Sequence, residues 1–581
     1  MKLWYKPNFI TICAILILSI PALFSLSRPG FYTSHDGETH TARIAQYYVA
    51  LKDDQFPPRF AGSFYNGLGS PIFVYIYPLP YLLGALLHFL GFSFVNAFKI
   101  LMVSGFIFSG IFTYIFLKEL TKSTKAAFVG SIYYIWSPYH LSLIYVRGSL
   151  SEHLAYTFLP LVFFAFTKLA NTKRTIWIPM TAIFVSFLLL SQNLVALISA
   201  PVVVIYILIL SFKTKSIKSL VYSILAGVWG LTISAFVYLP SVLEIKFIKF
   251  KQVISPVFAD HFVYIKQLIY SPWGYGFDMP GFSNDQLSLQ IGLAHLLILF
   301  LFTFLLIYFF IEKVLKMKRT FILNKLNKND LILMIFFITV IAIGTFLMIE
   351  DSITNYIWIQ FKLGKFIDIP WRLTGLVIFS ISIICAYLVK IGRPAILMFI
   401  LIVFVIIANR NHLRINETVQ HDDNFFLNYT GTATQYNEFT PNWRQTTRVP
   451  IGFDLNQKTT VVNGLANINT IINRSNNLSI NINVTSPEAK ILVNKFYFPQ
   501  TLVYKSNTLL QQDKDYYIAD STNLNLEKEQ DTSGLILMPL KYGKQTISMK
   551  YKETNLRLFA DLFSLGALMA ALGIIAINVK K

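Results

Sequence analysis

LILMIFFITVIAIGTFLM (residues 331–348) is an apolar run without a single charged residue. An α-helix rises about 1.5 Å per residue, so a run of this length approaches the roughly 30 Å hydrocarbon core of a bilayer. A second such run, LQIGLAHLLILFLFTFLLIYFFI, covers residues 289–311. Hydrophobic residues make up 55% of the 581-residue chain, and aromatic residues make up 16%. These features predict a polytopic α-helical membrane protein.

The same criterion predicts about twelve membrane spans. They are expected at residues 8–27, 94–117, 126–145, 154–168, 176–191, 194–212, 219–240, 289–311, 331–349, 373–389, 394–408 and 556–578. Residues 1–408 then form a transmembrane domain with a first outer loop at 28–93, and residues 556–581 form a last helix with a basic tail. The first apolar run lacks a small-residue cleavage site, so we expect it to be retained as a helix.

The net charge of +21 is concentrated in short tracts between the expected spans. These tracts are Lys2 and Lys6; Lys118, Lys122 and Lys125; Lys168, Lys173 and Arg174; Lys213, Lys215 and Lys218; Lys313 to Lys328; Lys390 and Arg393; and Lys580 and Lys581. Cytoplasmic loops are enriched in Lys and Arg, so the pattern predicts cytoplasmic termini in a multi-pass protein of the cell (inner) membrane. Because membrane topology explains the positive charge, no nucleic-acid partner is expected. The expected partner is the lipid bilayer.

The segment PIFVYIYPLPYLLGALLHFLGF (residues 71–92) is long enough to span but would reverse the sidedness of every later tract. Its three prolines and its tyrosines favour a segment that lies at the interface or dips in and returns. The alternative is an external N-terminus with a cytoplasmic loop at 33–60.

Residues 409–555 differ in composition, being rich in Asn and Thr with alternating polar and apolar positions. Stretches such as LSININV and KQTISMKY read as half-buried strands. We expect a small extracytoplasmic β-domain, tethered by the last helix.

The first outer loop contains TSHDGETHTARIAQYYVALKDDQFPPRF (residues 33–60). Ile44, Tyr47, Tyr48 and Leu51 have the spacing of one face of an amphipathic helix. Asp36 would lie at or before its N-terminus, where Asp is a favoured cap. The loop either contributes a helix cap and hydrated polar groups, or it contributes a catalytic site at the membrane surface.

Two further constellations are expected on the same face. YVRGSLSEH contains Arg147, Glu152 and His153, and KLGKFIDIPWRLTG contains Arg372. Arginine binds phosphate in a bidentate manner, so both can hold an anionic group. The alternatives are charges that mark the water boundary and an arginine that snorkels.

No metal or cofactor is expected. Cys13 and Cys385 both fall inside apolar spans, and the His35 to His40 cluster has no established metal-ligand spacing. Nucleotide-binding motifs are also missing from the sequence, so direct use of ATP or a nucleotide sugar is not expected.

Several stretches together resemble a known group of bacterial membrane proteins. These are FPPRF, YNGLGSPIFVYIYPLPYLLGALLHFLG, YYIWSPYHLSLIYVRGSLSEHLAYTFLPLVFFAF, GTATQYNEFTPNW and the closing YFPQTLVYK and GLILMPLKYGKQTISMKYKETNLRLFADLFSLG. They resemble the 6-pyruvoyl-tetrahydropterin-synthase-related membrane domain and the YfhO-like integral membrane proteins. Such proteins are similar in layout to GT-C glycosyltransferases.

This resemblance implies a glycosyltransferase that moves a sugar from a polyprenyl-phosphate donor to an envelope glycan, lipid or protein. In GT-C enzymes an acid in the first outer loop serves as the general base or positions the acceptor, which points to Asp36, with Glu38 as a second candidate. The chain has DGE where some members have DD or DE. The remaining expected substrate-binding residues are His35, His40, Arg43, Arg59, Arg147, Glu152, His153 and Arg372.

Two other functions stay open at this point. One is a transporter or flippase for a lipid-linked saccharide, although few ionisable groups fall at mid-span, where transporters usually bind substrate. The other is a non-enzymatic envelope assembly protein that works through its β-domain.

Overall fold

A computed structural model describes residues 6–254, 257–281, 286–314, 328–392, 394–432, 434, 437–447, 456–520 and 531–580. Its helices are α1 (Lys6–Leu23), α2 (Gly37–Lys52), α3 (Leu79–Phe89), α4 (Phe94–Thr121), α5 (Thr124–Ile135), α6 (Pro138–Tyr145), α7 (Leu150–Thr172), α8 (Trp177–Ser191), α9 (Asn193–Thr214), α10 (Ile217–Ile233), α11 (Ala235–Glu244), α12 (Phe250–Ile254), α13 (Ile265–Ile269), α14 (Leu293–Val314), α15 (Lys328–Met348), α16 (Ser352–Gln360), α17 (Thr374–Ile391), α18 (Pro394–Asn409), α19 (Asp423–Leu427) and α20 (Asn555–Lys580).

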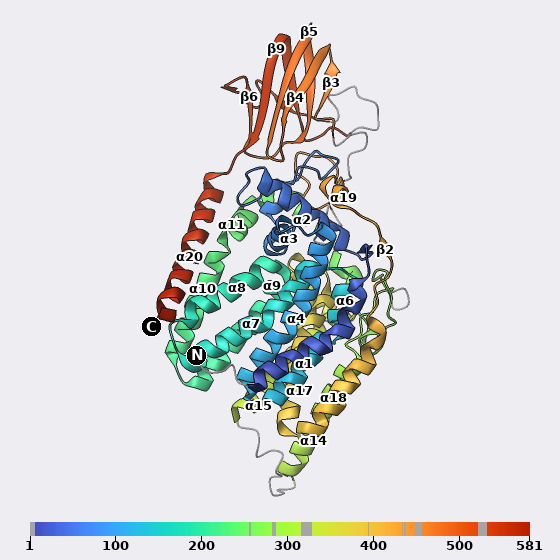
Figure 1. The fold of residues 1–581 in the computed structure, drawn as a ribbon, viewed down its shortest axis with the longest axis vertical. Helices are drawn as coiled ribbons and strands as arrows, with labels where there is room; N and C mark the ends of the chain where they lie inside the picture. Colours follow the sequence, from blue (N-terminus) through green and yellow to red (C-terminus); the bar gives the residue numbers. More distant parts are fainter. Residues whose placement is uncertain are drawn as a thin grey trace.

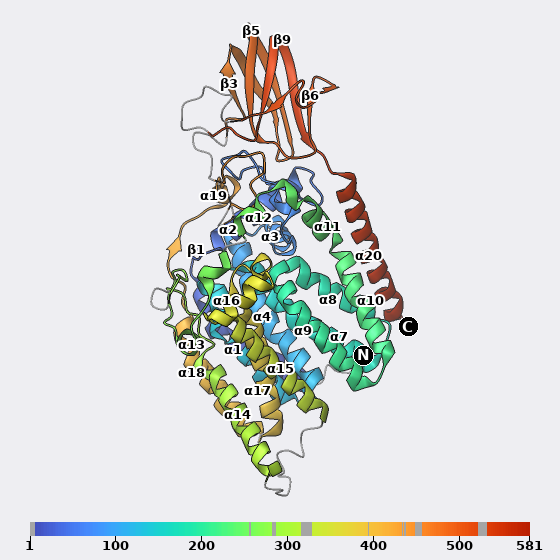
Figure 2. The same cartoon turned by 180° about the vertical axis from the view of Figure 1, so that it is seen from behind.

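The helices form one elongated bundle with a β-sheet at one end (Figure 1). The short helices α2, α3 and α19 lie between the sheet and the long helices, while both chain termini lie away from the sheet. The last helix, α20, runs down one edge of the bundle and packs against α8, α10 and α11. Figure 2 shows the opposite side, where α16 covers the bundle near α15. The sheet therefore caps the same end as the first outer loop.

Within the described residues, eight helices are long and apolar enough to cross a membrane. A ninth candidate is the pair Ile217–Ile233 and Ala235–Phe247, which is bent by 69° at its break. The apolar helices at Leu79–Phe89, Trp177–Ser191 and Leu293–Tyr308 are shorter. The chain is thus a helical, multi-pass type of protein with a C-terminal sheet, whereas the number of twelve spans stays a prediction.

The expected span at 126–145 is two helices rather than one. Helix α5 ends at Ile135, and α6 begins at Pro138 after Ser137 accepts a hydrogen bond from the His140 amide. Proline is favourable in the first turn of a helix, so it starts α6 while it prevents continuation of α5. With 12 residues, α5 is about 18 Å long and too short to cross a bilayer alone.

Residues 71–92 do not carry the chain across the bundle. They contain a short 3₁₀ turn and the 11-residue helix α3, which packs on α2. The Lys99 ammonium donates to the Arg28 carbonyl at 2.6 Å, which shows that the end of the first span and the start of α4 lie side by side. The chain therefore leaves and re-enters the bundle at the same end, as the interfacial interpretation of this segment requires.

Four of the basic tracts meet at the opposite end of the helices. Glu119 pairs with Lys122 and with Lys168, both at 2.6 Å. Lys390 pairs with Asp330 at 2.7 Å. Lys213 lies within electrostatic range of these groups. Lys2, Lys581 and the tract from residue 316 to 325 lie outside the described residues, so their placement stays a prediction.

The seven-stranded sheet is antiparallel, with the order β3-β5-β9-β6-β7, while β4 also pairs with β5 and β8 with β9. Its strands are β3 (Thr459–Asn463), β4 (Ala466–Asn473), β5 (Asn477–Phe496), β6 (Thr501–Lys505), β7 (Thr508–Leu509), β8 (Tyr517–Ile518) and β9 (Leu535–Tyr551). A smaller pair joins β1 (Phe31–Tyr32) to β2 (Thr418–Val419). The expected strands LSININV and KQTISMKY lie within β5 and β9, whereas TTVVNGLANINTIINR (residues 459–474), which also has a strand pattern, is divided into β3 and β4 at Gly464. Residues 478–484 and 489–496 are two parts of β5. The register shifts between them, at Val484 and Glu488, next to Pro487.

Candidate functional site

The first outer loop forms the helix that its periodicity predicts. Helix α2 begins at Gly37 and buries Ile44 and Tyr47. Asp36 occupies the N-cap position, but its carboxylate makes no capping hydrogen bond. The acid is therefore free of the structural role that its position would suggest. Its side chain is 39% exposed.

Two turns approach each other closely to place Asp36. The amide of His35 donates to the Val146 carbonyl at 3.0 Å, and the Asp36 amide donates to the Arg147 carbonyl at 2.7 Å. Gly148 follows with a φ of +59°, and a Cβ added there would lie 2.3 Å from the Ser34 hydroxyl oxygen. A glycine is needed at this point, because any side chain would separate the two turns.

The Arg147 cluster consists of Asp36, Arg147, Glu152 and Arg372. The Arg147 Nη1 donates to Glu152 Oε2 at 2.7 Å, and its Nη2 lies 3.9 Å from Asp36 Oδ2. Glu152 is fully buried and also accepts from the Tyr139 hydroxyl. Its Oε2 lies 3.6 Å from the Arg372 Nε. One buried carboxylate thus holds two guanidinium groups beside a half-exposed carboxylate.

Arg372 is only partly satisfied within this cluster. Its Nη1 donates to both oxygens of Asp368 at 2.8 Å, which fixes one edge of the guanidinium group. Its Nε is buried and has no hydrogen-bond partner among the described residues. A buried donor left unpaired costs free energy, so this nitrogen is suited to an anionic ligand.

A loop between α13 and α14 covers the cluster. The His35 ring stacks on Phe277 with centroids 4.3 Å apart, and its Nε2 lies 3.1 Å from the Tyr275 carbonyl. Burial lowers the pKa of His35, so the ring is neutral near pH 7 and Nε2 carries the proton toward that carbonyl. The neutral His35 ring therefore contributes packing and a hydrogen bond to the site, but no charge.

Asp278 of the same loop supports the Arg147 guanidinium indirectly, through Trp371. Trp371 lies 4.9 Å from it in a cation–π arrangement, and the Trp371 indole donates to Asp278 at 2.6 Å. Burial raises the pKa of Asp278, but hydrogen bonds from His261 and Trp371 outweigh it and lower the pKa overall. An ionised Asp278 therefore fixes the indole on which Arg147 rests.

Other predicted site residues lie outside the Arg147 cluster. His40 and Arg43 lie on the buried face of α2, where both contact the Tyr81 hydroxyl of α3, at 3.1 and 2.9 Å. The buried His153 contacts the Met102 carbonyl at 2.9 Å. Glu38 is 41% exposed and pairs with His421 at 3.4 Å. These residues support α2 and α7, and only Glu38 faces water.

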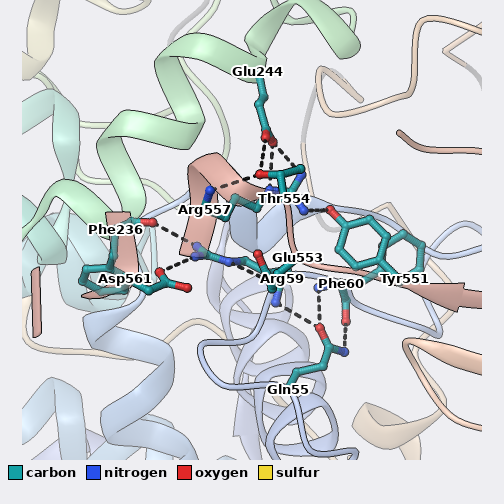
Figure 3. A network of polar contacts seen from close by, with 10 residues as sticks. All are labelled: Gln55, Arg59, Phe60, Phe236, Glu244, Tyr551, Glu553, Thr554, Arg557 and Asp561. Atoms are coloured by element: carbon teal, nitrogen blue, oxygen red, sulfur yellow. Dashed lines mark hydrogen bonds and ion pairs between the residues drawn. The ribbon is translucent and has the colours of Figure 1, made fainter. Parts of the chain in front are cut away.

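Arg59 belongs to a separate group, the Arg557 network, made by Arg59, Glu244, Glu553, Arg557 and Asp561. Figure 3 shows how it joins the first outer loop, α11 and the start of α20. Arg59 donates to Glu553 at 3.3 Å, to the Phe236 carbonyl at 3.0 Å and to Asp561 at 2.6 Å. All three guanidinium nitrogens of Arg59 are bonded within this network, so Arg59 lies apart from the Arg147 cluster, and its expected role in substrate binding stays a prediction.

Sequence reasoning missed several members of both groups. Asp368 lies four residues before Arg372, so helical spacing could have indicated that pair. Tyr139 and Asp278 carry no local signal, since each is brought to the cluster by tertiary packing. Arg557 lies at the start of the expected span 556–578 and Glu244 lies four residues after the expected span 219–240, positions where a charge is common and gives no specific signal. Among the described residues, no group of three or more His, Cys, Asp or Glu could hold a metal ion.

Comparison with known proteins gives one partial relative. No family model matches the chain. A protein of Lactococcus lactis subsp. cremoris (strain MG1363), described as an uncharacterized protein, is 27% identical over 249 residues. The match covers 42% of this chain and 41% of that protein, so the chain aligns with less than half of its relative. The relative indicates no activity.

Proposed function

We propose that the protein is a membrane glycosyltransferase that takes a sugar from a polyprenyl-phosphate-linked donor and transfers it to an envelope glycan, lipid or protein. The observation that carries the proposal is the half-exposed Asp36 carboxylate, 3.9 Å from Arg147 in a cluster with a second arginine. A base next to two cations is the arrangement that transfer from a phosphate leaving group needs.

In the proposed reaction, Asp36 accepts the proton of an acceptor hydroxyl as the hydroxyl oxygen attacks the anomeric carbon of the donor sugar. The bond between that carbon and the phosphate oxygen breaks, and polyprenyl phosphate leaves with the bonding electron pair. Arg147 and Arg372 stabilise the charge on the departing phosphate. The proton ends on Asp36 and passes to water, so the reaction needs neither ATP nor a redox partner.

Two features of the fold support this proposal. The Arg147 cluster lies at the starts of α7 and α17, whereas Lys168 and Lys390 lie at their other ends. The positive-inside rule places those lysines in the cytoplasm, so the cluster would face outward, where lipid-linked donors are used and nucleotides are absent. In addition, Glu152 is fully buried, which holds both arginines in fixed positions before substrate arrives.

A donor assay tests the proposal. The purified full-length protein in lipid vesicles is incubated with radiolabelled polyprenyl-phosphate glucose, mannose or galactose and with envelope extract as acceptor. We expect label in the extract, and Asp36→Asn should reduce its rate by about 100-fold or more, since a positioned base contributes about 10²–10⁴-fold. Asp54→Asn is the matched control in the same loop, because Asp54 is 79% exposed. Equal rates for wild type and Asp36→Asn would contradict the proposed role of the acid.

A transporter or flippase for a lipid-linked saccharide is a second candidate. The 69° break between α10 and α11 favours it, because discontinuous helices form substrate sites in many transporters. Movement of a fluorescent polyprenyl-phosphate saccharide across vesicle membranes, unchanged in Asp36→Asn and without sugar transfer, would select this candidate.

A further inference from the structure

An open cavity of about 340 Å³ lies at the end of α19, a helix that packs on α2. Its lining residues are Asn424, Phe425, Asn428, Tyr429, Thr430 and Gly431. Ligand pockets usually have volumes of about 300–1,000 Å³, so this cavity has room for a small polar molecule. It is separate from the Arg147 cluster, and Glu38 at the start of α2 lies beside the cavity.

Glu38 reaches the cavity through Tyr429. Burial raises the pKa of Tyr429 to about 12, and the charge of Glu38 and its hydrogen bond with the tyrosine add to this effect. Glu38 also pairs with His421, whose ring stacks on Phe425 with centroids 3.8 Å apart. The exposed Glu38 carboxylate therefore lies beside Tyr429 and is linked to Phe425 only through the His421 ring.

The walls of the cavity are held by backbone contacts to the first outer loop. The Tyr65 amide donates to the Gly431 carbonyl at 3.1 Å, and the Asn66 amide donates to the Thr430 carbonyl at 2.9 Å. The Ser63 hydroxyl donates to the Tyr429 carbonyl at 2.8 Å. A cavity fixed in this way loses little conformational entropy when it binds a ligand.

The lining offers hydrogen bonds and aromatic surface without cations. Asn428 donates from its amide to the Asn424 side-chain oxygen at 2.8 Å, and both residues are exposed. Phe425 and Tyr429 lie with their centroids 6.0 Å apart at 73°. Amides, a carboxylate and aromatic rings together suit a ligand with many hydroxyl groups and apolar ring faces. Glu38 and the nearby Asp422 would repel an anion.

We propose that this cavity binds a neutral saccharide unit of the acceptor, with Asn424, Asn428 and Glu38 bonding its hydroxyls and Phe425 and Tyr429 packing on its ring. The name acceptor rests on the proposed function, whereas saccharide binding does not. Glu38 follows the proposed base Asp36 by two residues at the start of α2, whereas Arg147 and Arg372 lie in the other group, so this cavity would set acceptor specificity apart from donor binding.

Saturation-transfer NMR on the full-length protein in lipid nanodiscs tests the proposal, with the methyl glycosides of glucose, galactose and N-acetylglucosamine as probes. We expect at least one glycoside to bind, and the double variant Asn424→Ala/Asn428→Ala to bind it at least about 5-fold more weakly. The matched control is Asn467→Ala/Asn469→Ala, because these asparagines are exposed on β4. If the double variant loses its fold, Tyr429→Phe replaces it, since it keeps the ring and removes only the hydroxyl; a loss of about 3-fold is expected.

Several results would overturn the proposal: no glycoside binds, the cavity variants bind as well as wild type, or a lysine-rich peptide binds in place of the glycosides. The result also separates this inference from the proposed function. Glycoside binding without sugar transfer in the donor assay keeps the saccharide site and removes the glycosyltransferase. Transfer with an unchanged acceptor KM in Asn424→Ala/Asn428→Ala removes the saccharide site alone.

Discussion

The Arg147 cluster and the Arg557 network are built from the same residue types, and both include residues of the first outer loop. In the Arg557 network every guanidinium nitrogen is bonded: Arg557 donates to Glu244 from Nε at 2.9 Å and from Nη2, and to the Tyr551 hydroxyl from Nη1. In the Arg147 cluster, by contrast, Arg372 Nε lies 3.6 Å from Glu152 Oε2 and makes no hydrogen bond among the described residues, and Asp36 is half-exposed.

Both groups contain the same charged residue types, so charge alone does not distinguish a structural ion-pair network from a candidate binding site. The completeness of their hydrogen bonding does. A network in which every guanidinium nitrogen is bonded fixes the relative positions of helices, and removing one of its arginines leaves a carboxylate without its cation. An incomplete network costs stability in the free protein and recovers it when a ligand supplies the missing partner. We therefore interpret the Arg557 network as a structural contact between helices and the Arg147 cluster as a candidate ligand-binding site.

The largest effect on stability is expected from Arg557→Met. Glu244 would remain buried with the Thr554 hydroxyl but without its cation, so the free energy of unfolding should fall by about 3–5 kcal/mol. Guanidinium-induced unfolding in detergent, followed by tryptophan fluorescence, measures the change. Glu244→Gln/Arg557→Met should recover most of it. Arg147→Met should cost less, because Glu152 keeps Tyr139 and Arg372; an equal loss at both arginines would erase the distinction.

Gly148→Ala tests whether the Arg147 cluster depends on the close approach of its two turns. A positive φ in alanine costs about 1–3 kcal/mol, and the new Cβ would push against the Ser34 hydroxyl. We expect a loss of stability of that size together with a loss of transfer activity, although no polar group is removed. Gly227→Ala is the control, since an added Cβ there meets nothing within 4 Å. Full activity in Gly148→Ala would show that the spacing of Asp36 and Arg147 is not critical.

Lys495 makes a pH-dependent contribution near the far half of the first outer loop. Burial lowers its pKa to about 7, with the charge of Lys458 acting in the same direction. In the unfolded chain the pKa returns toward 10.5, so between these values the unfolded state binds more protons. Stability should therefore rise with pH in this window, by at most about 1.4 kcal/mol per pH unit. Lys495→Met should flatten the unfolding profile there; an unchanged slope would assign the pH dependence to other groups.

Asp54→Ala should have the smallest effect. Asp54 pairs with Arg474 at 2.7 Å, but the side chains are 79% and 49% exposed. Exposed ion pairs contribute about 0–1 kcal/mol, so the free energy of unfolding should change by less than about 0.5 kcal/mol. A larger change would mean that the sheet depends on this contact more than its exposure indicates.

Much of the helical fold could be predicted because uncharged apolar runs have few alternatives in a membrane protein. The strands were predictable for a similar reason, since Leu478, Ile480 and Ile482 alternate with polar residues on one strand. The break at Ser137 was not, because a proline that begins α6 reads like one tolerated inside a longer helix. Similarly, the 69° bend at Ser234 has no strong local signal in the sequence.

The sequence indicated the four residues of the Arg147 cluster in the candidate site, but it did not indicate the partners with which each of them pairs. Asp36, Arg147, Glu152 and Arg372 were expected on one face, and the structure brings them together. The partners of Arg59 could not be found from the sequence, because they lie about 500 residues away and their pairing depends on tertiary packing. The cavity at α19 was missed for the same reason, since contacts with the first outer loop shape it.

The ion pair between Arg59 and Asp561 links residues that are 502 positions apart, which has a consequence for assembly in the cell. At about 5–20 residues per second, the ribosome makes Asp561 roughly 25–100 s after Arg59. During that time the arginine must wait in water or with temporary partners. Insertion of α20 then supplies Asp561 to Arg59, so the last helix completes the packing of the first outer loop. A chain truncated before α20 would lack this ion pair.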